Sequence, residues 1–110
     1  MELAEKELIQ QGKQIIKEYK HNRLLAQQGS LTLNHQGTQL VQHAQRYIDS
    51  IDRIIDLITP ERSQQVIILH GIQGQSAADL STVLACGISQ IYVAYRKGLI
   101  QLAQMYALTV

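Results

Sequence analysis

The most regular hydrophobic pattern in the chain lies between residues 38 and 58, where apolar residues recur at alternating steps of three and four. The positions of this series are Val41, Ala44, Ile48, Ile51, Ile55 and Ile58. Such spacing places them along one side of an α-helix, and Leu40, Tyr47 and Ile54 widen the same stripe. We therefore predict a helix that Thr38 caps and that ends near Ile58.

A second amphipathic helix is predicted from Glu2 to about Ala26. Its apolar residues recur near the helical period, and they are Leu8, Ile9, Ile15, Ile16 and Tyr19. Residues 28–37 (QGSLTLNHQG) separate the two predicted helices and contain two glycines and several small polar residues, which is typical of a loop. Leu31 and Leu33 form at most a short extended piece within it.

The broad stripe of residues 38–58 needs an apolar partner, and two partners fit the sequence. Either the N-terminal helix folds back on it as a hairpin within one chain, or a second copy of the chain packs against it. The hairpin is the more economical arrangement, and a dimer can coexist with it. We assign residues 1–58 to a helical hairpin that also serves dimerisation, with its loop at 28–37.

The remainder of the chain is predicted to form three helices, of which the first starts at Thr59 and Pro60. Thr59 can cap it, Pro60 has no N–H to leave unpaired, and Glu61 suits the positive end of the helix dipole. Its apolar run ends at Gly71–Gly74 and consists of Val66, Ile67, Leu69 and Ile72.

The second and third of these helices are separated by a short turn at residues 85–87. Ser76 is placed to cap the second helix, with Asp79 three residues later as in a capping box. The predicted inner face of this helix consists of Leu80, Val83 and Leu84. The third helix is longer and carries Ile91, Tyr95, Leu99 and Leu102 along one side.

Two helices joined in this way have the sequence form of a helix-turn-helix. Small Ser81 stands where the two helices would cross, small Ala85 stands at the turn, and β-branched Ile91 would fill the space between the helices. An ordinary helical hairpin within a bundle fits the same residues. The predicted fold is all-α, an N-terminal helical hairpin (1–58) followed by a three-helix helix-turn-helix domain (59–110).

About the last half of the chain resembles a known family. Residues 60–99, PERSQQVIILHGIQGQSAADLSTVLACGISQIYVAYRKGL, resemble the promoter-reading C-terminal domain of sigma factors. The continuation YRKGLIQLAQMYALTV is similar to the end of ArpU-type and RinA-type phage transcriptional regulators, which commonly have Ala where this chain has Gly98. The resemblance implies a small transcriptional activator of prophage late genes in Gram-positive bacteria.

Charge and composition restrict the function classes. A chain of 110 residues with net charge +1 and a pI near 7.9 lacks the basic excess usual for nucleic-acid binding, so such binding depends on how the charges are distributed. Half of the ten cationic side chains lie in the N-terminal helix, where a solvated face is the simpler interpretation and a phosphate-binding patch the rival. Those five residues are Lys6, Lys13, Lys17, Lys20 and Arg23.

No pattern in the sequence indicates catalysis, a metal site or a cofactor. The four His residues lack metal-ligand spacing, and the single Cys86 at the predicted turn suits a small apolar role. Asp49 is four residues from Arg53, which favours salt bridges on a solvated helix face. No apolar run approaches about 18 residues, and the charged N-terminus lacks a signal-peptide core, so we expect a cytoplasmic protein that is not an enzyme.

The predicted function is sequence-specific binding of double-stranded DNA by a transcriptional regulator, with the third helix entering the major groove. Gln90 suits an adenine edge, Val93 a thymine methyl group, and Arg96 and Lys97 backbone phosphates. The complete set of predicted DNA contacts is Gln75, Ser76, Ser89, Gln90, Tyr92, Val93, Arg96 and Lys97. We expect a homodimer, with RNA polymerase as a further partner. The alternative function is a helical adaptor or inhibitor of RNA polymerase, a sigma factor or another protein.

Overall fold

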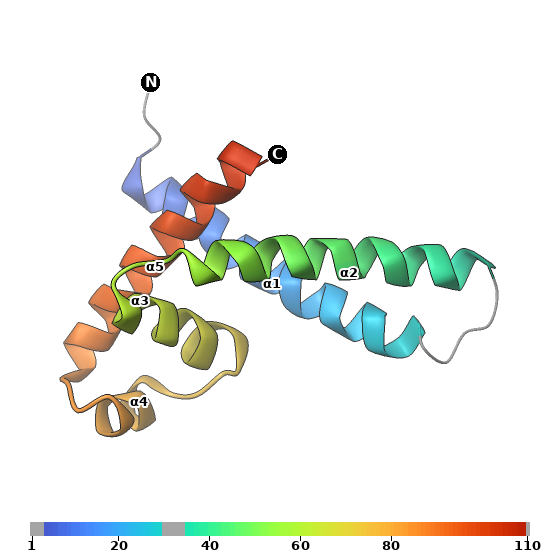
Figure 1. The fold of residues 1–110 in the computed structure, drawn as a ribbon. Coiled ribbons are helices and arrows are strands. Elements are labelled where there is room, and N and C mark those ends of the chain that lie inside the picture. The colour runs from blue at the N-terminus through green and yellow to red at the C-terminus, as the bar shows by residue number, and fades with distance from the viewer. Residues whose placement is uncertain (1–3, 30–34, 110) are drawn as a thin grey trace.

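The computed structural model describes residues 4–29 and 35–109, and within them every regular element is a helix. The elements in chain order are α1 (Glu5–Gly29), α2 (His35–Asp56), α3 (Glu61–Val66), the π-helical η1 (Ile67–Ile72), α4 (Ala77–Val83) and α5 (Ile88–Thr109). The predicted all-α class is therefore confirmed. Figure 1 shows α1 and α2 lying side by side as an extended arm, with the shorter helices and α5 gathered at one end of it.

The arm is an intrachain hairpin, as the hydrophobic pattern predicts. Its interface buries Ile15, Ile16 and Tyr19 of α1 against the predicted stripe of α2, including Ile48, Ile51, Ile54 and Ile55. Two tyrosines also connect the helices through their hydroxyl groups. Tyr19 donates to Oδ1 of Asp52 at 2.7 Å, and Tyr47 donates to Oε2 of Glu18 at 3.1 Å.

The ends of the arm differ from the prediction in three respects. The helix α2 begins at His35, so Thr38 lies inside it and does not cap it. The predicted loop is correspondingly shorter, and its residues 30–34, with Leu31 and Leu33, lie outside the described residues. Leu40 is 59% exposed and does not widen the buried stripe, because this part of α2 lies near the end of the arm, beyond most of the hairpin's buried residues.

The helices α3, α4 and α5 surround a second small core. Leu80 and Ile91 are fully buried in it, and the other buried members are Val66, Ala77 and Ala94. The chain turns by 102° between α4 and α5, within the range of about 90–120° found in helix-turn-helix units. Ile91 is fully buried in the core between the two helices, as predicted.

Local contacts at the ends of α3 and α4 confirm one predicted cap and correct two other details. The Ser76 hydroxyl accepts a hydrogen bond from the Asp79 N–H at 3.1 Å, as a capping residue does. Val83 is 66% exposed and does not belong to the inner face of α4. Thr59 is not the cap of α3, which starts after Pro60; instead its N–H donates to the side chain of Gln101 on α5 at 3.0 Å, and its carbonyl accepts from the same amide.

The helix α5 joins the two parts of the molecule. Its first half belongs to the second core, whereas Leu99 and Leu102 are buried together with α1, α2 and η1. Close approach is possible because α5 carries Gly98, where an added Cβ would lie 2.5 Å from Cγ1 of Ile67 and 3.2 Å from the Ser63 carbonyl oxygen. That contact gives a physical reason for glycine at this position. The division at residues 58 and 59 stays a prediction.

Candidate nucleic-acid interface

One edge of α5 is exposed along its first two and a half turns. The buried face of α5 here consists of Ile91, Ala94, Gly98 and Leu99, and the side chains on the opposite face point outward. The exposed set contains all the predicted contacts of this helix: Ser89, Gln90, Tyr92, Val93, Arg96 and Lys97. We call this set the reading edge. Because α4 crosses α5 steeply, the helix backbone of α4 does not lie along the reading edge.

Gln90 already has a hydrogen bond at the start of α5. Its Oε1 accepts from the Gly87 N–H at 3.2 Å, which closes the first turn of the helix. Pairing with adenine needs Oε1 as an acceptor and Nε2 as a donor. Adenine recognition by Gln90 therefore requires this exposed hydrogen bond to be exchanged, at little net cost because water or DNA can replace the lost partner.

Gln75 and Ser76 lie before α4, on the chain segment that leaves η1. The Gln75 N–H donates to the Leu69 carbonyl at 2.9 Å, and its carbonyl accepts from Nδ1 of His70 at 2.7 Å. Since a carbonyl can only accept, Nδ1 of His70 carries the proton. The backbone of Gln75 is thus occupied, and only its half-buried side-chain amide is left for a ligand. Ser76 is exposed and still has its hydroxyl proton to donate.

A pocket of about 580 Å³ opens where α1 and α5 meet, and we call it the α1/α5 pocket. Two of its walls carry cations, Lys13 from α1 and Arg96 from α5. Its lining residues are Ile9, Lys13, His70, Tyr92, Tyr95, Arg96 and Leu99, without any acidic side chain. The pocket therefore combines positive charge with aromatic surface, next to the reading edge.

The aromatic side of this pocket is a fixed edge-to-face cluster. The His70 ring lies 4.8 Å from the Tyr95 ring and 6.4 Å from the Tyr92 ring, measured between centroids. Tyr95 makes no side-chain hydrogen bond to any other described residue, and burial raises its pKa, which keeps the hydroxyl protonated as a donor. Cations, a phenol and exposed aromatic surface are groups that bind phosphates and the sugars and bases beside them.

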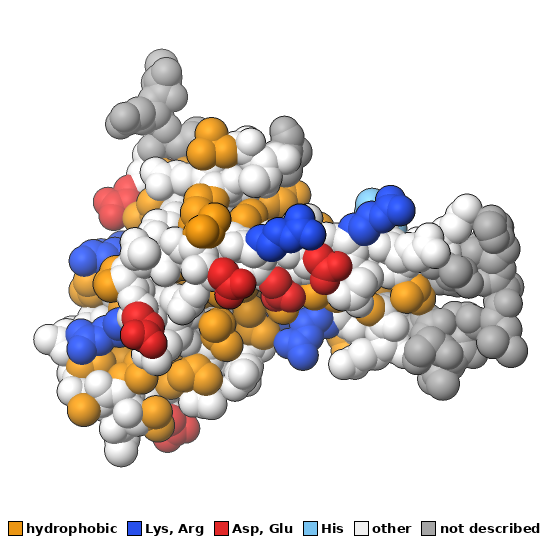
Figure 2. Space-filling view, in the orientation of Figure 1, with side chains coloured by type: hydrophobic (Ala, Val, Ile, Leu, Met, Phe, Trp, Pro, Cys, Tyr) orange, Lys and Arg blue, Asp and Glu red, His pale blue; other side chains and the backbone are white. Residues whose placement is uncertain are grey.

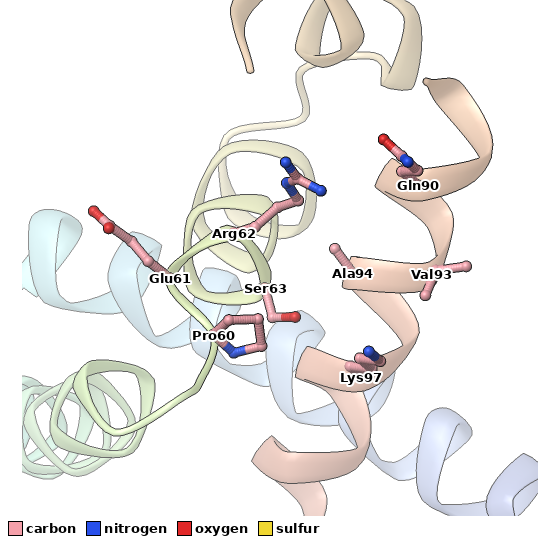
Figure 3. A pocket seen from close by; sticks show the side chains of 8 residues that line it. All are labelled: Pro60, Glu61, Arg62, Ser63, Gln90, Val93, Ala94 and Lys97. Carbon is pink, nitrogen blue, oxygen red and sulfur yellow. The ribbon is translucent and has the colours of Figure 1, made fainter. Parts of the chain in front are cut away.

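A second pocket, of about 470 Å³, lies on the other flank of α5 against α3 (Figure 3). Two cations, Arg62 of α3 and Lys97 of α5, and one carboxylate, Glu61, border this α3/α5 pocket, and Gln90 and Val93 of the reading edge also line it. Ser63 points from α3 towards α5 in Figure 3, and its fully buried hydroxyl has no hydrogen-bond partner among the described residues. The reading edge is thus flanked by one pocket on each side, and each pocket is bordered by two cations.

The cations near the reading edge are not neutralised within the described chain. Lys13, Arg62, Arg96 and Lys97 form no ion pair with any described residue. The salt bridge expected between Asp49 and Arg53 is also missing, because Asp49 instead accepts a hydrogen bond from Nε2 of Gln45 at 3.0 Å. Figure 2 shows acidic and basic side chains interspersed over α2, whereas hydrophobic side chains gather over α3, α4 and the start of α5.

Other kinds of site find no support in the described part of the chain. No three His, Cys, Asp or Glu side chains among these residues are close enough together to hold a metal ion. Cys86 is half-buried and its thiol is free. Its backbone carbonyl accepts a hydrogen bond from the Ser81 hydroxyl. Among the described helices, none is by itself long and apolar enough to cross a membrane, and α4 with α5 reaches that composition only as a pair bent by 102°.

Sequence reasoning found the reading edge but missed Lys13, His70 and Tyr95 as neighbours of Arg96. These residues come from α1, η1 and the half-buried side of α5, and no local sequence signal relates them. No protein-family model matches this sequence, and comparisons with curated proteins and with solved structures likewise give no match. The functional argument therefore rests on the geometry of the chain itself.

Proposed function

We propose that this protein is a sequence-specific double-stranded DNA-binding regulator of transcription whose helix α5 reads bases in the major groove. The observation that carries the proposal is the reading edge, an exposed face of α5 that includes Arg96 and Lys97. Lys13 and Arg62 lie on its two flanks, and none of these four cations has an ion partner among the described residues. The 102° turn between α4 and α5 supports it, because this angle lets the second helix project into a groove while the first crosses above the backbone.

The chemistry of the reading edge suits both tasks of a DNA-binding helix. Gln90 and Val93 lie nearest the start of α5 and have the groups that recognise adenine and the thymine methyl group. Arg96 and Lys97 lie one to two turns later and diverge to opposite flanks, into the α1/α5 and α3/α5 pockets. In this arrangement base contacts lie in the middle and phosphate contacts on either side, with Ser89, Tyr92 and Ser76 as further polar contacts.

The low net charge supports weak binding by a single copy. Two copies on two half-sites would compensate, so the proposal includes a homodimer, although no second copy is present in the structure. Activation of prophage late genes, with RNA polymerase as a further partner, follows from the resemblance to ArpU-type and RinA-type regulators and belongs to the same proposal.

A helical adaptor that binds RNA polymerase or a sigma factor is the second candidate. The specific observation in its favour is the exposed apolar surface around the turn, where Val83, Ile88, Tyr92 and Val93 are 66%, 48%, 51% and 47% exposed. Exposed apolar side chains that lie close together are typical of protein-binding surfaces. The first candidate is preferred because Tyr92 and Val93 also suit base contacts and because four of the five charged side chains that line the two neighbouring pockets are cations.

The decisive experiment selects bound fragments from a random-sequence duplex pool with the purified protein. Enrichment of a shared motif is expected, and Gln90→Ala should relax the preference at one position of that motif. The double variant Arg96→Gln, Lys97→Gln should weaken binding to all sequences and lower the slope of log affinity against log salt by about 2. Arg46→Gln with Arg53→Gln on α2 removes two cations outside the reading edge and is the matched control.

Two outcomes would reject the DNA-binding proposal: a pool without enrichment, or undiminished binding by the Arg96 and Lys97 double variant. The adaptor is tested separately with purified RNA polymerase and the variant Val83→Ser, Ile88→Ser. Loss of polymerase binding in this variant, together with failure of the duplex selection, would establish the second candidate instead.

A further inference from the structure

Four lysines of α1 lie on one line along the helix. Lys6, Lys13 and Lys20 are seven residues apart, which is close to two helical turns, and Lys17 falls on the same face four residues after Lys13. All four are exposed. We call them the lysine stripe, and at 1.5 Å per residue the stripe is about 21 Å long.

Acidic residues of α1 are separated from this stripe. Glu5, Glu7 and Glu18 each lie about a quarter turn or more around the helix from the line of lysines. Glu18 is moreover held on the α2 side by the hydrogen bond that it accepts from the Tyr47 hydroxyl. The four lysines therefore form one positive face of α1, apart from its carboxylates.

The stripe passes directly beside the reading edge. Its second lysine, Lys13, lines the α1/α5 pocket with Tyr92 and Arg96 of that edge. The contact is close because the preceding residue, Gly12, is packed against Leu99, which places α1 across α5 just after the predicted base contacts. Positive charge is thus continuous from Arg96 through Lys13 onto α1.

The lysine stripe is electrostatically unfavourable in a chain that has no anion bound to it. Lysines spaced by three and four on one helix face repel each other by a few tenths of a kcal/mol per pair, and those of the stripe form no ion pair with any described residue. A regular row of anions relieves this repulsion, and the phosphates along one strand of a nucleic-acid duplex form such a row.

We propose that the lysine stripe and the α1/α5 pocket form a second phosphodiester-binding surface, on which one strand of the duplex runs along α1 while α5 contacts the bases. The inference rests on the proposed DNA binding. A backbone phosphate lies between Lys13 and Arg96 at the mouth of the pocket, where the Tyr95 hydroxyl and the Tyr92 ring can contact the phosphate and its sugar. The footprint is therefore wider than the helix-turn-helix alone would give.

The test measures duplex affinity across a series of salt concentrations, with a duplex selected from the random pool and with an arbitrary duplex. Each lost phosphate contact lowers the salt slope by about 0.9. Lys13→Gln should therefore lower it by about 1, and the triple variant Lys6→Gln, Lys17→Gln, Lys20→Gln by about 2–3, without a change in sequence preference. Arg46→Gln with Arg53→Gln on α2 removes two cations from another helix, between the losses in the two test variants, and should leave the slope unchanged.

The variants are expected to fold like the natural chain, because glutamine is a good helix former and the lysines have no ion partners among the described residues. Circular dichroism and the thermal midpoint check this. A single neutral methylphosphonate linkage, moved along one strand, should weaken binding of the natural chain wherever it replaces a contacted phosphate. At the phosphate assigned to Lys13 and Arg96 it should weaken binding of Lys13→Gln less than binding of the natural chain.

The outcomes separate the two proposals. If stripe variants bind the selected duplex with the natural slope and selectivity, the inference is wrong and the DNA-binding function stands. If selected and arbitrary duplexes bind equally and the stripe variants weaken both, the stripe binds phosphate and the sequence-specific function is wrong. Absence of binding to either duplex overturns both.

Discussion

Gly12 of α1 lies so close to Leu99 of α5 that a Cβ atom on Gly12 would be 2.5 Å from the Leu99 carbonyl oxygen and 2.9 Å from its Cβ. Both atoms belong to the rigid part of a helix, so neither can move aside as the end of a long side chain can. The contact fixes the crossing of the two helices, and it places Lys13, the next residue, at the wall of the α1/α5 pocket.

Gly12→Ala is expected to destabilise the protein. The substitution gains about 1 kcal/mol of helix propensity, but overpacking against a backbone costs about 1–3 kcal/mol and also separates other contacts between α1 and α5. We expect the free energy of unfolding to fall by about 1 kcal/mol, measured by urea denaturation. Gln11→Ala, at an exposed position of the same helix, is the control and should change stability by less than about 0.5 kcal/mol. A more stable Gly12→Ala variant would contradict the close contact.

Periodicity was sufficient to predict which faces of α2 and α5 are buried, although it left open whether α1 or a second copy of the chain covers the stripe of α2. In α2 the steps of three and four select Ile48, Ile51 and Ile55, which are buried, and in α5 the same rule separates buried Ile91 from exposed Tyr92. These predictions succeed because the helical repeat determines which residues share a face, independently of what covers that face.

Some of the errors concern features that depend on distant parts of the chain. Thr59 has the chemistry of a cap, yet its backbone groups are held by Gln101, which lies 42 residues away. Val83 has the spacing of an inner residue, but α5 turns away before it can cover that position. The neighbourhood of Lys13 and Arg96 depends on Gly12, and a glycine in a helix gives no sequence signal for the surface that it approaches.

The turn between α4 and α5 contains a residue in a conformation that favours glycine. Ala85 has φ of +53°, in the left-handed region, where a Cβ atom costs about 1–2 kcal/mol. Ala85→Gly removes that strain and adds about 0.4–1 kcal/mol of unfolded-state entropy, so the variant should be as stable as the natural chain or more stable by up to about 1 kcal/mol. Ala85→Val should be less stable, because a β-branched side chain fits this region poorly.

Gly87, two residues later, provides the comparison for this turn. Its φ lies outside the left-handed range, and a Cβ atom there would meet only the Ser89 hydroxyl oxygen, at 3.9 Å. Gly87→Ala should therefore be tolerated, with a thermal midpoint within a few degrees of the natural value. If Ala85→Val proved harmless and Gly87→Ala strongly destabilising, the assignment of the strained position in this turn would be wrong.

Stability should decrease at high pH because of Tyr19. Burial, reinforced by the hydrogen bond to Asp52 and by the charge of that carboxylate, raises the pKa of Tyr19 from about 10 to about 12. Between these values the unfolded chain has released the phenolic proton and the folded chain still holds it, so the unfolded state binds fewer protons and the free energy of unfolding falls as pH rises. Below pH 10 the contribution is fully present. Tyr47, whose pKa is raised by burial and by its bond to Glu18, acts in the same direction.

Tyr19→Phe separates this effect from general alkaline denaturation. The variant loses one hydrogen bond and should be less stable by about 0.5–1.5 kcal/mol at neutral pH, with little further cost because Asp52 is exposed and stays hydrated. Between pH 10 and 12 its stability should fall less steeply than that of the natural chain, since one late-titrating phenol is absent. Urea denaturation at several pH values measures the slope, and tyrosinate absorbance counts the phenols that titrate late. Parallel slopes for the two proteins would mean that Tyr19 titrates in the folded hairpin as it does in the unfolded chain.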